Sequence, residues 1–146
     1  VYSPDVYKNL VPKDHFLYKV NELVDFSFVN EECRDLYSEG IGRPVTNTPE
    51  IMFRSAFVQN HYDYSDREME EHARCHLTVK WFLGFNIDDS SYDHSALGDF
   101  RNRLGEQKWK DIFFKILKPQ KMTSNQKKLK LLKLNKIKKK KILKIY

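Results

Sequence analysis

The stretch SDREMEEHARCHLTVKWFLGFNIDDSSYDHSALGDFRNRLG, residues 65–105, decides the fold. It opens with Ser65 and, three residues later, Glu68. This spacing is a capping box, in which each side chain satisfies a backbone amide at the start of a helix. The residues that follow repeat their apolar positions at helical spacing, and Gly84 is expected to end the helix. The stretch therefore predicts one amphipathic helix over residues 66–83.

A second, shorter helix is predicted at the end of the same stretch, after a polar loop over residues 85–93. Ser95 is expected to cap it, and its core side consists of Leu97, Phe100 and Leu104. A support helix, a loop and a short helix with basic and amide side chains are one arrangement that presents residues to a DNA groove. We therefore expect a helix-turn-helix-like pair, with a loop longer than the turn of about three or four residues in a tight motif.

The rest of the chain shows the same helical spacing. Thr48-Pro49 places a capping hydroxyl before a proline at the first helical position, which is a strong helix start. Further helices are predicted from near Asp14 to Val24, over Glu31–Ser38, from Pro49 with a buried side of Met52, Phe53, Ala56 and Phe57, and through Trp109, Ile112, Phe113, Ile116 and Leu117. The predicted fold class is therefore all-α, a compact helical bundle of five to six helices.

Charge divides the chain into two parts. The whole chain has 26 basic and 20 acidic residues, a net charge of +6. Residues 118–146 hold twelve lysines and no acid, which leaves 14 basic and 20 acidic residues, or −6, for residues 1–117. We therefore predict an acidic folded domain over residues 1–117, followed by a disordered or irregular basic tail.

The composition of residues 118–146 differs from that of the domain before it. This tail contains no Val, Ala, Asp, Glu or Gly, the amino acids whose codons begin with G. It is rich in Lys, Asn, Ile and Leu, which is typical of an A/T-rich gene translated in the wrong frame. Our hypothesis is that the tail is an out-of-frame or low-complexity sequence with a non-specific affinity for nucleic acids.

The candidates for DNA contact come from the two helices of the deciding stretch: Arg67, Ser95, Arg101, Asn102 and Arg103. On the short helix, Ser95 and Asn102 point away from the apolar side, and the two arginines flank it. Asparagine can pair with adenine, and arginine can pair with guanine or a phosphate. The alternative is that the arginines only form surface ion pairs with acids such as Asp99 or Asp111.

No metal or cofactor is predicted. His72 and His76 lie four residues apart beside Cys75, but a zinc site needs three or four converging ligands. Because these histidines fall on the apolar stripe, we expect them to be core residues bonded to a neighbour. The loop acids lack a rigid scaffold for a two-metal site, so they are predicted to act in turns and caps: Asp88, Asp89 and Asp93.

The number of cysteines and the hydropathy of the sequence indicate in which cellular compartment the protein is expected. The chain has two cysteines, Cys33 and Cys75, which argues against a disulfide framework and favours a reducing cytosol. No stretch approaches the roughly 20 apolar residues that cross a bilayer, so no membrane partner is expected. These features together with the DNA candidates predict a cytoplasmic, nucleoid-associated protein.

Short motifs follow one another in a fixed order along residues 9–117: Leu-Val-Pro-Lys-Asp-His-Phe-Leu at 10–17, Asp-Phe-Ser-Phe at 25–28, Gly-Arg-Pro at 42–44, Thr-Pro-Glu at 48–50, Tyr-Ser-Asp-Arg-Glu at 64–68, Trp-Phe-Leu-Gly at 81–84, His-Ser-x-Leu at 94–97 and Phe-Arg-x-Arg-Leu-Gly at 100–105. In this order they resemble the N-terminal domain of bacterial insertion-sequence transposases of the InsH-like, DDE type. In that family a helical DNA-binding region precedes an RNase H-like catalytic domain with an Asp, Asp, Glu metal site.

The resemblance implies a DNA-binding fragment. No position of this chain matches the catalytic acids, so the resemblance implies no catalytic residues and no enzymatic activity. It implies double-stranded DNA at the terminal repeats of the element as the main partner. A second copy of the chain or a full-length transposase would be a further partner. The alternative reading is a helical protein–protein module, for dimerisation or transpososome assembly, that does not contact DNA directly.

Overall fold

The computed structural model describes residues 3–36 and 47–117. Within these ranges it contains eight α-helices, one 3-10 helix and no strand, which confirms the predicted all-α class. The elements are α1 (Ser3–Leu10), α2 (Phe16–Leu23), α3 (Phe28–Glu32), η1 (Arg34–Leu36), α4 (Pro49–Tyr62), α5 (Asp66–Cys75), α6 (Leu77–Leu83), α7 (His94–Leu104) and α8 (Glu106–Leu117). The tail hypothesis concerns residues outside the described ranges.

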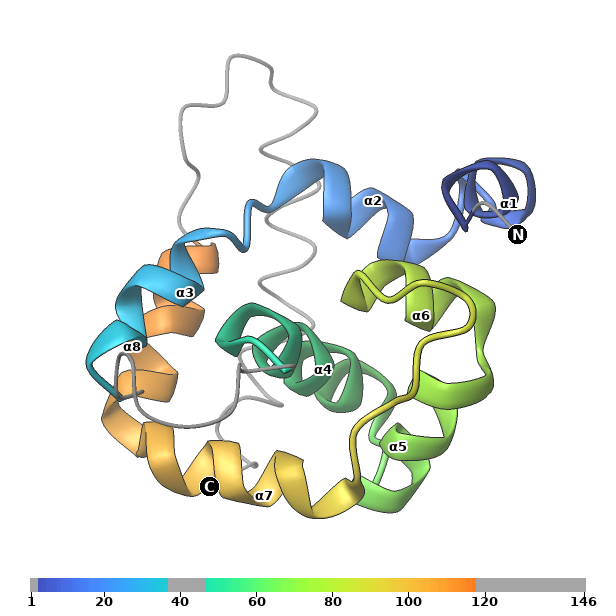
Figure 1. Ribbon diagram of the computed structural model, residues 1–146. Helices are drawn as coiled ribbons and strands as arrows, with labels where there is room; N and C mark the ends of the chain where they lie inside the picture. Colours follow the sequence, from blue (N-terminus) through green and yellow to red (C-terminus); the bar gives the residue numbers. More distant parts are fainter. Residues whose placement is uncertain (1–2, 37–46, 118–146) are drawn as a thin grey trace.

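Helix α4 lies at the centre of the bundle, with most of the other helices arranged around it (Figure 1). It packs against α3, α5, α6 and α7. The buried side predicted for it is confirmed, since Met52, Phe53, Ala56 and Phe57 are all buried. Ser55, Val58 and Asn60 are buried as well. The helix is thus enclosed on more sides than a surface helix with one apolar stripe would be.

The predicted helix starts of α4 and α5 are confirmed. The hydroxyl of Thr48 accepts a hydrogen bond of 3.3 Å from the backbone N–H of Ile51. In the capping box, the Glu68 N–H donates to the Ser65 hydroxyl over 3.2 Å, and the Ser65 N–H donates to the Glu68 carboxylate over 2.7 Å. Both caps satisfy amides that have no partner within the helix, which fixes where each helix begins.

The prediction of one continuous helix over residues 66–83 is wrong. His76 has an extended backbone (φ −91°, ψ 117°) and separates α5 from α6. The break leaves the backbone bonded on both sides, because the His76 N–H still donates to the His72 carbonyl and the Lys80 N–H donates to the His76 carbonyl. The helical periodicity therefore runs across the break almost unchanged. Gly84, in a left-handed conformation (φ 89°), ends α6 as predicted.

Two further differences concern the N-terminal part. Helix α1 was not predicted, and together with the division of residues 66–83 it raises the helix number from the predicted five to six to eight in the described ranges. The helix predicted from near Asp14 begins at Phe16, because His15 rather than Asp14 caps it. The helix predicted over residues 31–38 is instead the end of α3 followed by η1, and residues 37–38 lie outside the described ranges.

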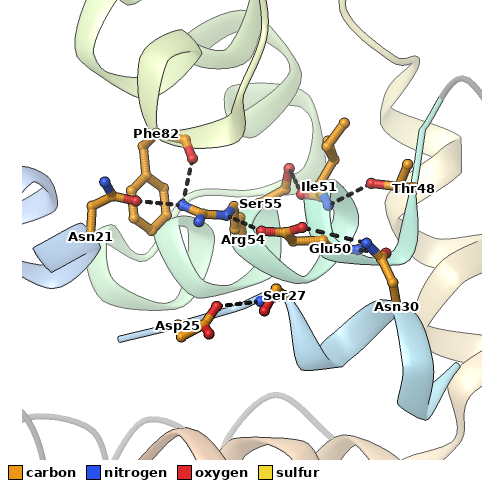
Figure 2. A network of polar contacts seen from close by, with 10 residues as sticks. All are labelled: Asn21, Asp25, Ser27, Asn30, Thr48, Glu50, Ile51, Arg54, Ser55 and Phe82. Atoms are coloured by element: carbon orange, nitrogen blue, oxygen red, sulfur yellow. Dashed lines mark hydrogen bonds and ion pairs between the residues drawn. The ribbon is translucent and has the colours of Figure 1, made fainter. Parts of the chain in front are cut away.

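A polar network around Arg54 of α4 joins the N-terminal helices to the centre of the bundle (Figure 2). The Arg54 guanidinium donates to the Glu50 carboxylate over 3.2 Å, to the Asn21 side-chain oxygen over 3.0 Å and to the Phe82 carbonyl over 2.8 Å. Asn30 accepts a bond of 3.0 Å from the Glu50 N–H. Burial lowers the pKa of Arg54, and the nearby Glu50 opposes this shift. One side chain thus connects α2, α4 and α6.

Candidate nucleic-acid interface

Helix α7 carries most of the predicted DNA contacts. Its predicted core side is confirmed, since Leu97, Phe100 and Leu104 are buried. The predicted cap is wrong: Asp93, not Ser95, caps the helix, and its carboxylate accepts a bond of 3.0 Å from the Ser95 N–H. Both residue types are good caps, so the sequence alone does not choose between them. The same bond, together with the charges of His94 and Arg67, lowers the pKa of Asp93.

Four of the five candidate side chains are exposed. Ser95, Asn102 and Arg103 are exposed on α7, and Arg67 is exposed in the first turn of α5. The two helices pack against each other, and Arg67 lies close enough to Asp93 to lower its pKa. The structure therefore brings Arg67 near the start of α7. Asn102 and Arg103 lie about 10 Å further along the helix, at a rise of about 1.5 Å per residue.

Arg101, the fifth candidate, forms a forked ion pair with Asp66 of α5. The two guanidinium nitrogens donate to the two carboxylate oxygens over 3.0 and 2.8 Å. Gln59 donates to the same carboxylate over 2.7 Å. These bonds hold the pKa of Asp66 below its usual value, the contribution of Arg101 being the largest. The ion pair expected as the alternative role of Arg101 thus exists, with a different acid from the two considered, and it fixes α7 against α5.

The helix-turn-helix-like pair differs from the prediction in its packing. Helix α7 packs against α4, α5 and α8, so its partner within the deciding stretch is α5, and α6 comes between them in the sequence. The loop over residues 84–93 is fixed by Lys80, whose buried ammonium donates to the carbonyls of Arg74 and Asp89 over 3.2 and 3.1 Å. This role of Lys80 was not predicted from the sequence.

Two of the three loop acids, Asp89 and Asp93, act in a turn and a helix cap, as predicted. The Asp89 carboxylate accepts a bond of 2.8 Å from the Asn86 N–H, which stabilises the turn, and Asp93 caps α7. Asp93 also belongs to a cluster with Glu70 and His94, whose side-chain ligand atoms all lie within 4.8 Å of one another.

This cluster has cations beside it. The His94 Nδ1 lies 2.9 Å from Asp93 and 3.2 Å from Glu70, and Arg74 donates to the other oxygen of Glu70 over 2.9 Å. The charge of Arg67 also acts on Asp93. Because basic side chains already offset the negative charge, the cluster is an ion-pair network between α5 and the start of α7.

The prediction that His72 and His76 are core residues is wrong for both, although each is bonded to a neighbour as expected. His76 is exposed, and its Nδ1 accepts a bond of 3.2 Å from the Val79 N–H as the cap of α6. His72 is half-buried, donates from Nδ1 to the Glu68 carbonyl over 2.8 Å, and stacks on Tyr64 with ring centroids 4.1 Å apart. The core prediction fails for His76 because the break in the backbone turns its side chain out of the stripe.

The described helices define a small all-α domain with exposed polar side chains along α7 and at the start of α5. A family model described as a transposase domain (DUF772) matches residues 5–103, and the chain belongs to this family. The match confirms the predicted relation to the N-terminal region of insertion-sequence transposases. No curated protein and no solved structure is detectably similar to the chain. Among the described helices, none has the length and hydropathy needed to cross a membrane.

Proposed function

We propose that this chain is a DNA-binding N-terminal fragment of an insertion-sequence transposase that recognises the ends of its element and has no strand-transfer activity. The observation that carries the proposal is the exposed set of Arg67, Asn102 and Arg103 on two packed helices of a transposase-family domain. These are side-chain types that bind phosphates and base edges.

Each candidate has a proposed role. Asn102 and Arg103, at the C-terminal end of α7, would contact base edges in a groove. Arg67 and Ser95, near the N-terminal end of α7, would contact the phosphate backbone. Arg101 would act by holding α7 against α5 through Asp66, because both of its bonds to Asp66 are short and forked. The domain would then bind DNA with a local basic surface even though its total charge is negative.

The test compares the whole 146-residue chain on a duplex of the element's terminal repeat and on a scrambled duplex, at about 0.15 M salt, where non-specific Kd values are typically about 10⁻⁴–10⁻⁶ M. Asn102→Ala and Arg103→Ala are each expected to reduce the preference for the terminal repeat about tenfold, within the range for a bidentate base contact. Arg34→Ala is a matched control, since Arg34 is an exposed arginine on η1, paired only with the nearby Glu31 in the bonds described.

Equal affinity of the unmodified chain for both duplexes would refute recognition of element ends. Nicking of the terminal repeat by the purified chain in Mg²⁺ or Mn²⁺ would refute the absence of activity. The Arg34→Ala control should keep the preference for the terminal repeat, and a folding defect in the Asn102 or Arg103 variant would be detected as a loss of binding to both duplexes.

A second candidate function is a protein–protein contact between transposase copies. A groove of about 760 Å³ runs beside α8 and is lined by Leu104, Lys108 and Phe114, among others. The Phe114 side chain is 54% exposed, which is high for a large apolar residue. Under this proposal the chain oligomerises in a concentration-dependent way without binding duplex DNA, and Phe114→Ser shifts it towards the monomer in sedimentation experiments.

A further inference from the structure

Two histidines cap two helices that pack against each other. His15 precedes α2, and its Nδ1 accepts a bond of 3.1 Å from the Leu17 N–H. His76 precedes α6, and its Nδ1 accepts a bond of 3.2 Å from the Val79 N–H. Both residues have the extended backbone of a helix cap. We call this pair the histidine caps; α2 and α6, which they begin, are in direct contact.

A histidine cap depends on the protonation state of the ring. The Nδ1 accepts a bond only when it carries a lone pair, so each neutral ring has its proton on Nε2. When the ring takes up a second proton, Nδ1 becomes an N–H that faces the backbone N–H and the positive end of the helix dipole. Serine, threonine and aspartate caps do not lose their acceptor in this way near neutral pH.

The surroundings of His76 also disfavour its charged form. Partial burial lowers the pKa of His76, and the charges of His72 and His15 lower it further. His72 faces it from α5, with ring centroids 5.9 Å apart, and His15 faces it from the start of α2. Among the described residues, these two are the charged groups that shift the titration of His76.

We propose that the histidine caps make the packed pair of α2 and α6 sensitive to pH: the two helix starts are held while the Nδ1 atoms accept their bonds, and the pair opens when acidification removes these acceptors. Opening would remove two caps at once and place positive charges on neighbouring rings. The α2–α6 contact would then depend on the remaining packing, which includes Tyr18 stacked on Trp81 with ring centroids 5.4 Å apart.

The direction of the pH effect follows from proton linkage. A histidine in water has a pKa of about 6.5, and the pKa of His76 in the folded protein is lowered from this value. The stabilisation from the His76 cap is therefore complete above the ordinary pKa and is lost as the pH falls through the lowered one. Between pH 7.5 and pH 5.5, protonation of His76 should therefore raise the opening equilibrium by up to about tenfold, the ratio of charged to neutral ring at one unit below an ordinary histidine pKa.

The test measures hydrogen exchange in the full 146-residue chain at pH 7.5 and 5.5, corrected for the intrinsic exchange rate at each pH. Amides of α2 and α6 should lose up to about tenfold more protection than those of α7 and α8. In the double variant His15→Ser, His76→Ser, serine keeps an acceptor that does not titrate, so this selective loss should disappear. His94→Gln is the matched control, since His94 lies outside the histidine caps, and it should retain the loss.

Two results would overturn the proposal. One is a protection loss of the same size in the double serine variant and in the unmodified chain; the other is a loss spread evenly over all helices. If the double variant fails to fold, nitrogen chemical shifts of the imidazole rings in the unmodified chain decide the question. The proposal requires both rings to carry their proton on Nε2 at pH 7.5, and it requires the pKa of His76 to lie below the ordinary histidine value; a proton on Nδ1 or a raised pKa of His76 excludes it.

Discussion

The Arg54 guanidinium lies 4.6 Å from the centroid of the Phe26 ring and 4.9 Å from that of Phe82. Its side chain is 15% exposed, and that of its ion-pair partner Glu50 is 26% exposed. A largely buried guanidinium is stable only if its N–H groups have acceptors. Here the acceptors are the Glu50 carboxylate, the Asn21 amide oxygen and the Phe82 carbonyl. The residue stabilises the fold through this complete set of contacts, whereas an exposed ion pair contributes little.

Replacement of Arg54 by alanine is therefore expected to destabilise the protein by about 3 kcal/mol, because Glu50 is left half-buried without its cation. Arg54→Lys should recover only part of the loss, since an ammonium group lacks the planar set of donors that reaches Glu50, Asn21 and Phe82 and cannot stack over two rings as a guanidinium does. Urea unfolding of the full chain measures both effects. Arg34→Ala, which removes an exposed ion pair, is the control and should change the unfolding midpoint little. Similar midpoints for the Arg54 and Arg34 variants would contradict the role assigned to Arg54.

At the scale of elements, the position of α7 depends on side chains that are far apart in the sequence. Asp66 and Arg101 are separated by 35 residues, and their ion pair joins the first turn of α5 to the last turn of α7. Lys80 of α6 fixes the loop that leads into α7, because its ammonium donates to a carbonyl of that loop. These contacts explain how a short helix after a ten-residue connection keeps a defined orientation.

The ion pair predicts an acid-dependent loss of stability. The pKa of Asp66 lies below its ordinary value of 3.8, so the pair stabilises the folded state above that pH and loses this effect as the pH falls through the lowered value. Acid titration of unfolding should therefore show a smaller decrease below pH 4 in Asp66→Asn than in the unmodified chain. If α7 also binds DNA as proposed, Arg101→Gln should weaken the preference for the terminal repeat at neutral pH. An unchanged acid profile in Asp66→Asn would mean that the pair does not hold the two helices.

The same elements show how far the sequence could predict this molecule. Local rules were sufficient where a cap and its helix are adjacent, as at Thr48 and Ser65, and where glycine ends a helix, as at Gly84. They failed at His76, because the apolar period continues across the break and histidine is an uncommon cap. They also could not connect Arg101 with Asp66, since local spacing says nothing about a partner 35 residues away. The exposed candidates on α7 were predicted from periodicity, which is itself a local property.

At the scale of the whole molecule, charge is distributed unevenly along the chain. Residues 1–117 carry a net charge of −6, and residues 118–146 carry twelve lysines without an acid. Long-range attraction to a polyanion is therefore expected to come mainly from the lysines, while the proposed base contacts come from α7. Non-specific affinity and sequence preference should then respond to different substitutions, because only the first depends mainly on the number of phosphates neutralised.

This separation gives a quantitative prediction for salt dependence. Each neutralised phosphate contributes about −0.9 to the slope of log K against log salt concentration, so replacing Lys138, Lys139, Lys140 and Lys141 by glutamine should reduce the slope by up to about four. The ratio of affinities for terminal-repeat and scrambled DNA should remain the same in that variant. Arg103→Ala should do the opposite, changing the slope by at most about one while lowering the ratio. If the ratio instead falls with the four lysines and is unaffected by Arg103, sequence recognition belongs to the lysine-rich segment, and the assignment of α7 as the DNA-binding helix is wrong.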